Sequence, residues 1–318
     1  MEKILVTLPV NEKQRRRLEK DKAEFDFEYV KRSDVTPEQI AEADYIIGNV
    51  EASYIKGSPK LKLLQLNSAG TDGYTKEGVL APNTILANAT GAYGKAVSEH
   101  MFAMLLALQK KLMLYRDDQY KGEWNDYGSV TSITDSTVLV VGLGDIGKSF
   151  AKMCKALGAY VIGVKRRPSE CPEEVDELVL MDEFKDKVPK ADVVFSVLPN
   201  TPATSGIYNE EFFKLMKPTG IFLNAGRGNA VNQEALLEAL QKGDIGAAGL
   251  DVTNPEPLPA EHPLWAESKV LITPHISGQY HLPETLDRIV EIGASNVERY
   301  IKGEDLLNIV DFETGYCK

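Results

Sequence analysis

His275 is the residue of this chain best placed to do chemistry, because it ends an apolar, strand-like segment in the run VLITPHISG. Arg227 stands at a similar place in GIFLNAGRGNAV, and Asp251 and Glu256 follow an apolar run in AAGLDVTNPEPL. Open parallel sheets bind ligands at the carboxyl ends of their strands. A carboxylate beside His275 would favour the imidazolium, and Arg227 could hold a carboxylate through two hydrogen bonds. The set suits proton donation to a carbonyl substrate oriented by a positive group.

Two of these residues, Arg227 and Glu256, also have a plainer interpretation. Arg227 taken alone reads as a surface turn and Glu256 as part of a solvated loop. Of the other histidines, His100 lies within a long apolar helix and His262 in the Pro-rich run PAEHPLW, so both are expected to be structural. His281, at the start of the last helical segment, remains the alternative acid–base residue.

A glycine-rich turn follows the strand-like run TVLVV and reads GLGDIG. A helical segment and a second apolar strand come after it, as in a dinucleotide-binding turn. Gly142 would allow the tight turn, Gly144 the approach of a pyrophosphate, and Gly147 the packing of helix on strand. Asp145 and Ile146 open the helix whose N terminus would face the phosphates. The alternative is an ordinary turn between a strand and a helix.

Three adjacent positive charges, Lys165, Arg166 and Arg167, end the second strand. Dinucleotide-binding domains usually carry Asp or Glu there, which accepts a hydrogen bond from the adenosine ribose. A carboxylate would repel a 2′-phosphate, whereas a cluster of cations would bind it. The run therefore favours a phosphorylated ribose, with a solvated basic turn as the alternative.

The elements that position these residues alternate between strand and helix. At 318 residues the chain is long enough for two domains. Apolar strands and helical segments alternate up to about residue 94, and the pattern resumes at STVLVVGLGDIG. Residues 95–119 read as one long apolar helix between the two alternations. The last helix, in LPETLDRIVEIGASNVERYIKGE, precedes a loose tail. This order predicts parallel sheets covered by helices.

Composition excludes several other classes of protein. The chain holds 36 Lys and Arg against 47 Asp and Glu residues, which argues against nucleic acid as a partner. No apolar run approaches the roughly 20 residues that span a bilayer, so no membrane association is expected. Cys154, Cys171 and Cys317 form neither a metal-binding pair nor a disulfide framework. We therefore expect a cytoplasmic protein without a metal.

Five motifs occur in order over nearly the whole chain, namely GLGDIG, VLPNTPATSGIYN, LNAGRG, GLDVTNPEPL and ITPHISG. In these motifs the chain resembles the D-isomer-specific 2-hydroxyacid dehydrogenases, which include phosphoglycerate, glyoxylate/hydroxypyruvate and D-lactate dehydrogenases. The resemblance implies an α/β fold of two doubly wound parallel-sheet domains. A Rossmann NAD(P)-binding domain, residues 95–277, would be inserted in a flavodoxin-like substrate domain, residues 1–94 and 278–318. It also implies a homodimer formed largely through the nucleotide domains.

The resemblance assigns roles to the catalytic candidates. Arg227 would bind the substrate carboxylate and carbonyl, His275 would be the acid–base, and Glu256 would pair with His275. The run NSAGTD matches the family's substrate loop, so N–H groups near Ala69 and Gly70 would hold the carboxylate. The implied reaction is reversible reduction of a small 2-oxo acid to a D-2-hydroxy acid by NAD(P)H. A non-catalytic, cofactor-sensing corepressor on the same scaffold is the alternative.

The resemblance also implies contacts to the cofactor outside the glycine turn. Asp251 matches the acid near the nicotinamide amide. Further cofactor positions are expected at Leu198, Pro199, Thr204, Ala225, Gly226 and Gly278. Lys165 departs from the Asp of members that use NAD, whereas members that accept NADP(H) carry Arg at or just after this position. NADP(H) is therefore the favoured cofactor, and NAD(H) is possible.

Overall fold

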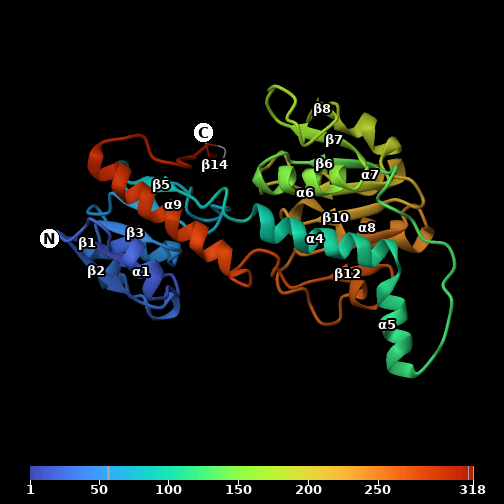
Figure 1. Ribbon diagram of the computed structural model, residues 1–318, viewed down its shortest axis with the longest axis horizontal. Coiled ribbons are helices and arrows are strands. Elements are labelled where there is room, and N and C mark those ends of the chain that lie inside the picture. Colours follow the sequence, from blue (N-terminus) through green and yellow to red (C-terminus); the bar gives the residue numbers. More distant parts are fainter. Residues whose placement is uncertain (56–57, 314, 318) are drawn as a thin grey trace. The chain divides into compact units, whose positions relative to one another are not determined.

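Residues 1–55, 58–313 and 315–317 are described by a computed structural model, in which the chain forms two units (Figure 1). Unit 1 comprises Met1–Tyr93 and Leu282–Lys318, and unit 2 comprises Gly94–His281. Unit 2 is thus an insertion in the sequence of unit 1. Each unit has its own parallel sheet, which confirms the predicted fold class of two doubly wound α/β domains.

Unit 2 is built on a seven-stranded parallel sheet in the order β12-β11-β10-β9-β6-β7-β8. Its strands are β6 (Thr137–Val141), β7 (Tyr160–Lys165), β8 (Glu177–Leu180), β9 (Val193–Ser196), β10 (Ile221–Asn224), β11 (Ala247–Leu250) and β12 (Val270–Ile272). This is the Rossmann order, in which the chain reverses direction across the sheet between β6 and β9. Ligands of such sheets bind beyond the carboxyl ends of the strands at that reversal.

Helices cover both faces of this sheet (Figure 1). The helices of unit 2 are α4 (Gly94–Gln109), α5 (Leu112–Lys121), α6 (Asp145–Ala156), α7 (Glu210–Leu215), α8 (Gln233–Lys242) and the 3-10 helices η2 (Phe184–Lys190), η3 (Gly228–Ala230) and η4 (Pro263–Ala266). On one face α4 and α6 pack together, with the rings of Phe102 and Phe150 6.0 Å apart. On the other face η2, α7 and α8 enclose an aromatic core around Phe212 and Phe222. The strands read as continuous apolar runs because both of their faces are buried.

The described residues of unit 1 form a five-stranded parallel sheet in the flavodoxin-like order β2-β1-β3-β4-β5. Its strands are β1 (Glu2–Val6), β2 (Phe25–Tyr29), β3 (Tyr45–Ile47), β4 (Leu63–Gln65) and β5 (Ile85–Ala87). Its helices are α1 (Glu12–Glu19), η1 (Arg32–Asp34), α2 (Pro37–Glu42), α3 (Ala52–Ile55) and α9 (Pro283–Lys302). Reciprocal caps start α1 and α2, where Asn11 pairs with Gln14 and Thr36 with Gln39.

The structure corrects two expectations about single elements. Residues 95–119 do not form one helix, because α4 ends at Gln109 and α5 begins at Leu112. Lys111 between them has a φ of +55°, in the left-handed region. The sequence around it contains no Gly or Pro that would predict this break. The tail is not loose, since β13 (Val310–Asp311) pairs with β14 (Tyr316–Cys317) in an antiparallel hairpin.

Candidate active site and cofactor site

The glycine turn joins β6 to α6 at the edge of the unit 2 sheet where its strands end. Gly142 has a φ of +105°, and a Cβ placed there would lie 2.9 Å from the carbonyl oxygen of Val197. A Cβ on Gly147 would lie 2.1 Å from the carbonyl oxygen of Gly142, so the helix could not pack against the turn. A Cβ on Gly144 would meet no atom within 4 Å. Two glycines are therefore required by close packing, whereas Gly144 faces open space.

The start of α6 suits an anionic ligand. Gly144 is its N-cap and supplies no side-chain hydrogen bond, so the first N–H groups, from Asp145 and Ile146 onward, have no intrahelical partner. The carboxylate of Asp145 lies toward α4, since its Oδ1 would be 2.5 Å from a Cβ on Gly94. Open space above Gly144 beside unpaired N–H groups fits the pyrophosphate of a dinucleotide.

The basic run lies next to this turn. The carbonyl of Val164, near the end of β7, accepts hydrogen bonds from the N–H groups of Gly142 at 3.2 Å and Leu143 at 3.1 Å. Lys165 follows at once, and its Nζ donates to Oγ of Ser169 at 2.9 Å. The side chains of the next two residues, Arg166 and Arg167, are exposed. Three cations thus lie beside the turn, at the position expected for an adenosine ribose.

The segments after β9 and β10 pack backbone to backbone. A Cβ on Gly226 would lie 2.3 Å from the carbonyl oxygen of Leu198, so only glycine allows this approach. The N–H of Ala225 donates to the carbonyl of Ser196 at 3.0 Å. Beyond β9, the hydroxyl of Thr204 donates to the carbonyl of Pro199. The structure thus brings these predicted cofactor residues to the same sheet edge as the glycine turn.

Arg227 follows directly and is half-buried just before η3. Its Nη1 donates to the carbonyl of Gly226 at 2.8 Å. On its other side, a Cβ on Gly228 would lie 1.9 Å from the carbonyl oxygen of Thr253. The guanidinium is therefore held by a backbone that packs tightly against the segment carrying Glu256.

His275 and Glu256 are in direct contact. Nδ1 of the ring lies 2.9 Å from Oε2 of the carboxylate, and Oε1 accepts from the N–H of Thr253 at 3.2 Å. The two side chains remain accessible, with 50% of His275 and 39% of Glu256 exposed. His275 has a φ of +51°, in the left-handed region that residues other than glycine adopt infrequently. A carboxylate bonded to one ring nitrogen orients the other nitrogen for proton exchange.

Asp251 holds the turn that carries His275. Its Oδ1 accepts from the hydroxyl of Thr273 at 2.6 Å and from the N–H of Ile276 at 3.0 Å. Its Oδ2 accepts from the N–H of Ser277 at 3.1 Å and from the Ser277 hydroxyl. Its carbonyl accepts from the N–H of His275 at 2.8 Å. A carboxylate has about four acceptor positions, so hydrogen bonds within this turn occupy most of the acceptor positions of the buried Asp251 side chain.

His100, which we expected from the sequence to be structural, belongs to this network. Nε2 of His100, on α4, lies 3.0 Å from the hydroxyl of Thr273 and 3.9 Å from Oδ1 of Asp251. No local motif announces this contact, because His100 and Thr273 are 173 positions apart. His262 instead caps η4, where its Nδ1 accepts from the N–H of Leu264. His281 is exposed.

Gly278 lies past the turn, half-buried next to Ser277. The following residue, Gln279, has a φ of +24° and donates from Nε2 to the carbonyl of His275 at 3.0 Å. The backbone of His275 is therefore held at both its N–H and its carbonyl group.

Ala69 and Gly70 belong to unit 1, in the segment after β4. The Ala69 carbonyl accepts from Nδ2 of Asn88 at 2.8 Å, and the Gly70 carbonyl accepts from the hydroxyl of Ser68 at 2.6 Å. Within the described residues, the N–H groups of Ala69 and Gly70 donate to no other group. Two N–H groups in one short segment can bind an anion.

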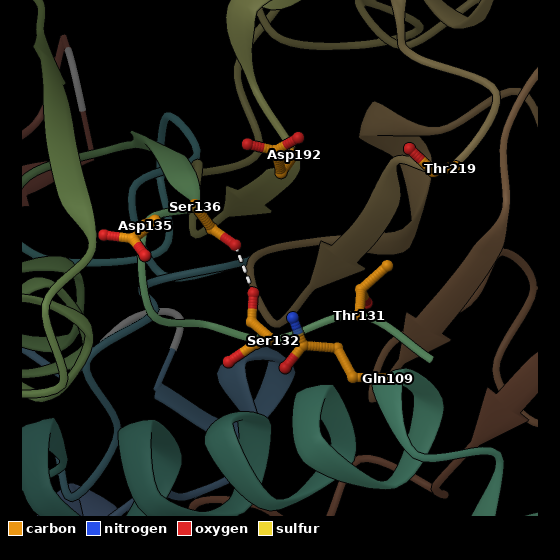
Figure 2. Close-up of a pocket in the computed structure, with 7 residues that line it drawn as sticks. All are labelled: Gln109, Thr131, Ser132, Asp135, Ser136, Asp192 and Thr219. Carbon is orange, nitrogen blue, oxygen red and sulfur yellow. Dashed lines mark hydrogen bonds between the residues drawn. The ribbon is translucent and has the colours of Figure 1, made fainter. Parts of the chain in front are cut away.

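A separate polar hollow of about 250 Å³ lies at the opposite edge of the unit 2 sheet (Figure 2). Ser136, Asp192 and Thr219 line it just before β6, β9 and β10, and the Ser136 hydroxyl donates to the Ser132 carbonyl. Because it adjoins the amino ends of the strands, it is distinct from the candidate site.

In residues 1–55, 58–313 and 315–317, no three His, Cys, Asp or Glu side chains are grouped as metal ligands. None of the helices described there combines the length and apolar character needed to cross a bilayer.

Comparison with known proteins places this geometry in a family. Residues 102–277, more than half of the chain, match the model of the D-isomer specific 2-hydroxyacid dehydrogenase NAD binding domain. The human glyoxylate reductase/hydroxypyruvate reductase is 32% identical over 253 residues, covering 77% of this chain and 76% of that protein.

Solved structures agree. A D-isomer specific 2-hydroxyacid dehydrogenase family protein from Aeromonas salmonicida is 31% identical, with a TM-score of 0.86 over 98% of this chain and 99% of that one. The NADPH-dependent glyoxylate/hydroxypyruvate reductase of Sinorhizobium meliloti, in complex with NADP and sulfate, is 25% identical, with a TM-score of 0.84 over 99% of this chain and 100% of that one. This chain therefore belongs to the D-isomer-specific 2-hydroxyacid dehydrogenase family and is an NAD(P)-dependent oxidoreductase.

Proposed function

We propose that this enzyme reduces a small 2-oxo acid to the D-2-hydroxy acid, reversibly, with NADPH preferred over NADH. The observation that carries the proposal is the contact of 2.9 Å between Nδ1 of His275 and Oε2 of Glu256. This pair follows strands of the same sheet whose glycine turn fits a dinucleotide. An imidazole bonded to a carboxylate at such an edge is suited to protonate a carbonyl oxygen as it becomes an alkoxide.

The residues divide the work of the reaction. NADPH, when bound, would supply the hydride that reduces the carbonyl carbon of the substrate. His275 donates a proton to the carbonyl oxygen, and Glu256 stabilises the imidazolium that holds this proton beforehand. Arg227 binds the substrate carboxylate and polarises the carbonyl. Hydride and proton together convert the 2-oxo acid into the hydroxy acid, and His275 accepts the proton in the reverse reaction.

We assign the substrate-binding role to unit 1 and the nucleotide-binding role to unit 2. In unit 1, the N–H groups of Ala69 and Gly70 would donate to the substrate carboxylate. The support is that their carbonyls are bonded within the unit, whereas these N–H groups donate to nothing among the described residues. In sequence terms the proposed domains are residues 1–94 with 278–318, and 95–277.

The proposed preference for NADPH rests on charge. Lys165, Arg166 and Arg167 lie beside the glycine turn, where a carboxylate would otherwise accept a hydrogen bond from the ribose. Arg166 is the best single ligand for a 2′-phosphate because its planar guanidinium can bind two oxygens at once. The Sinorhizobium relative, which is NADPH-dependent by name, supports the same assignment.

A steady-state assay tests the proposal. The unmodified enzyme would be assayed with pyruvate, glyoxylate, hydroxypyruvate and bulkier 2-oxo acids, each with NADPH and with NADH. We expect turnover of at least one acid and a higher kcat/KM for NADPH. Binding of cofactor without turnover of any acid would instead favour the non-catalytic, corepressor-like alternative.

We further propose that the enzyme is a homodimer formed through unit 2. Figure 1 shows α5 and the loop after it extending away from the sheet of that unit. Residues 112–130 expose several large apolar side chains, namely Leu112, Tyr115, Tyr120, Trp124 and Val130. A second copy would cover them, as exposed apolar patches usually mark interfaces. Light scattering should give a dimer mass, and Tyr120→Ser with Trp124→Ser should shift it toward the monomer.

The cytoplasmic location expected from the scattered cysteines stays a prediction. Cys154 is buried, Cys171 exposed and Cys317 half-buried, and all three thiols are free. Fractionation of cells that produce the protein would test the location.

A further inference from the structure

The segment Asn67–Thr71, named here the substrate loop, is anchored by its carbonyl groups. This inference rests on the proposed role of the loop in binding a substrate carboxylate. Each of its five carbonyls accepts a hydrogen bond from unit 1. The donors, in chain order, are the Tyr93 hydroxyl, the Ala89 N–H, the Asn88 amide, the Ser68 hydroxyl and the Tyr74 N–H. The carbonyl groups of the loop therefore point toward the rest of unit 1.

Because each peptide group is planar, a hydrogen bond that fixes a carbonyl also fixes the direction of the next N–H group. The C=O of one residue and the N–H of the next share a plane and point in opposite directions. The N–H of Ala69 is thus set by the carbonyl of Ser68, and the N–H of Gly70 by the carbonyl of Ala69. Within the described residues neither N–H donates to another group, so both are available to an anion.

The two anchors differ in kind. The Ser68 carbonyl is held by the backbone N–H of Ala89 at 3.0 Å, which no substitution removes except proline. The Ala69 carbonyl is held by a side chain, Nδ2 of Asn88, at 2.8 Å. Of these two anchors, only the one from Asn88 is a side chain. A substitution of Asn88 can therefore change the direction of the Gly70 N–H.

Asn88 is itself fixed on all sides and is fully buried. Its Oδ1 accepts from the N–H of Thr90 at 3.1 Å and lies 3.0 Å from Sγ of Cys317, so Nδ2 must face Ala69. Burial raises the pKa of the Cys317 thiol, which keeps it protonated as a donor at neutral pH.

The C-terminal segment supports the same arrangement from the other side. The N–H of Asn88 donates to the carbonyl of Asn308 at 3.2 Å, and Nδ2 of Asn308 donates to the Thr90 carbonyl at 2.7 Å. The hydroxyl of Thr71 donates to the carbonyl of Gly315 at 2.9 Å. The tail thus holds both Asn88 and the end of the substrate loop.

We propose that Asn88 is a positioning residue for the substrate: its side-chain amide, braced by the C-terminal segment, directs the Gly70 N–H toward the carboxylate of the 2-oxo acid. Asn88 does not touch the substrate. Its effect is on binding of the carboxylate, and the hydride and proton transfers keep the same participants.

Asn88→Ala tests this directly. We expect KM for the preferred 2-oxo acid and Kd for oxamate, an analogue that is not reduced, to rise about tenfold or more, the effect of one hydrogen bond to a charged group. The Kd for NADPH, measured by calorimetry, should not change. Thr84→Ala is the matched control, since it removes another buried side-chain hydrogen bond of unit 1, from the Thr84 hydroxyl to the Leu61 carbonyl at 2.7 Å, which involves neither Asn88 nor the loop.

Asn88→Asp covers the case in which the alanine variant does not fold. A protonated carboxyl can still donate to the Ala69 carbonyl, whereas a carboxylate cannot. The ratio of its KM to the wild-type KM should therefore fall as pH is lowered. A KM equal to wild type at every pH, or an Asn88→Ala effect no larger than that of Thr84→Ala, would overturn the inference. An unmodified enzyme that reduces no 2-oxo acid would overturn the proposed function as well.

Discussion

Nδ1 of His275 lies 2.9 Å from Oε2 of Glu256, although the two residues are 19 positions apart. The backbone holds both partners, because the His275 N–H donates to the Asp251 carbonyl and the Glu256 carboxylate accepts from the Thr253 N–H. With Nδ1 bonded to a carboxylate, Nε2 is the ring nitrogen that can exchange a proton with substrate. The tautomer and the direction of the ring are thus set before substrate arrives.

Removing the imidazole should abolish most of the turnover. His275→Ala is expected to lower kcat by roughly 10²–10⁴-fold, the usual contribution of a general acid. Glu256→Gln should lower kcat less than His275→Ala does, because the ring keeps its place but loses the carboxylate that orients it. Steady-state kinetics from pH 5 to 9 would measure both effects.

His281→Ala is the control for this pair, since His281 is an exposed histidine six positions away. It should keep the wild-type kcat. Near-complete activity in a folded His275→Ala enzyme, together with loss in His281→Ala, would move the acid–base role to His281.

Reversing the charge at the end of β7 should reverse the cofactor preference. One charge-assisted contact contributes about 1.5–3 kcal/mol, so the unmodified enzyme should favour NADPH by roughly ten- to a few hundred-fold in kcat/KM. Lys165→Asp with Arg166→Ala should favour NADH instead. The preference of the unmodified enzyme should shrink as salt is added, because the cations are near the surface.

Lys152→Asp with Lys185→Ala makes the same change in net charge at exposed positions of α6 and η2 and should leave the preference unchanged. A clear NADH preference in the unmodified enzyme would reduce the basic run to a solvated turn.

Alanine substitutions separate the roles of two glycines in the turn. Gly144→Ala meets no atom within 4 Å and should fold with a stability loss below about 1 kcal/mol. Its affinity for cofactor should nevertheless fall, because the new methyl group occupies the space assigned to the pyrophosphate. Gly147→Ala brings a Cβ to 2.1 Å from a backbone oxygen and should cost about 1–3 kcal/mol of stability. Thermal unfolding and calorimetric titration with NADPH would distinguish the two, and unchanged affinity in Gly144→Ala would contradict the assignment.

Acid should remove a specific contribution to the stability of unit 1. Nε of Arg17, on α1, lies 2.6 Å from Oε2 of Glu291, on α9. This hydrogen bond lowers the pKa of the Glu291 carboxyl from its ordinary value of 4.5. A lowered pKa contributes stability that is complete above the unfolded pKa and disappears as pH falls through the folded pKa.

Arg17→Met should therefore destabilise the protein at pH 7 by no more than about 1 kcal/mol, since the pair is partly exposed and screened by solvent. The difference from wild type should shrink as pH falls below 4.5 and through the lowered pKa of Glu291. Urea unfolding at several pH values would measure it, and a deficit that persisted in acid would assign the effect to packing of the Arg17 side chain.

The sequence alone predicts the family, the two parallel sheets and the edge at which the candidate residues gather. These features are visible in short stretches of sequence. Apolar runs predict buried strands, and GLGDIG predicts the turn into α6. Polar residues that directly follow a strand, such as Arg227 and His275, must lie at the carboxyl end of that strand. The break between α4 and α5 escapes this reasoning, because Lys111 adopts a left-handed φ in a run without glycine or proline.

Only the tertiary structure decided how the side chains are used. Asp251 reads from sequence as a cofactor residue, yet its carboxylate is bonded to Thr273, Ile276 and Ser277. His100 reaches Thr273 across 173 positions, and Asn88 reaches the thiol of Cys317 across 229. A hydrogen bond needs atoms placed within a few tenths of an ångström, and between distant residues that placement comes from the packing of whole elements, which no local pattern contains.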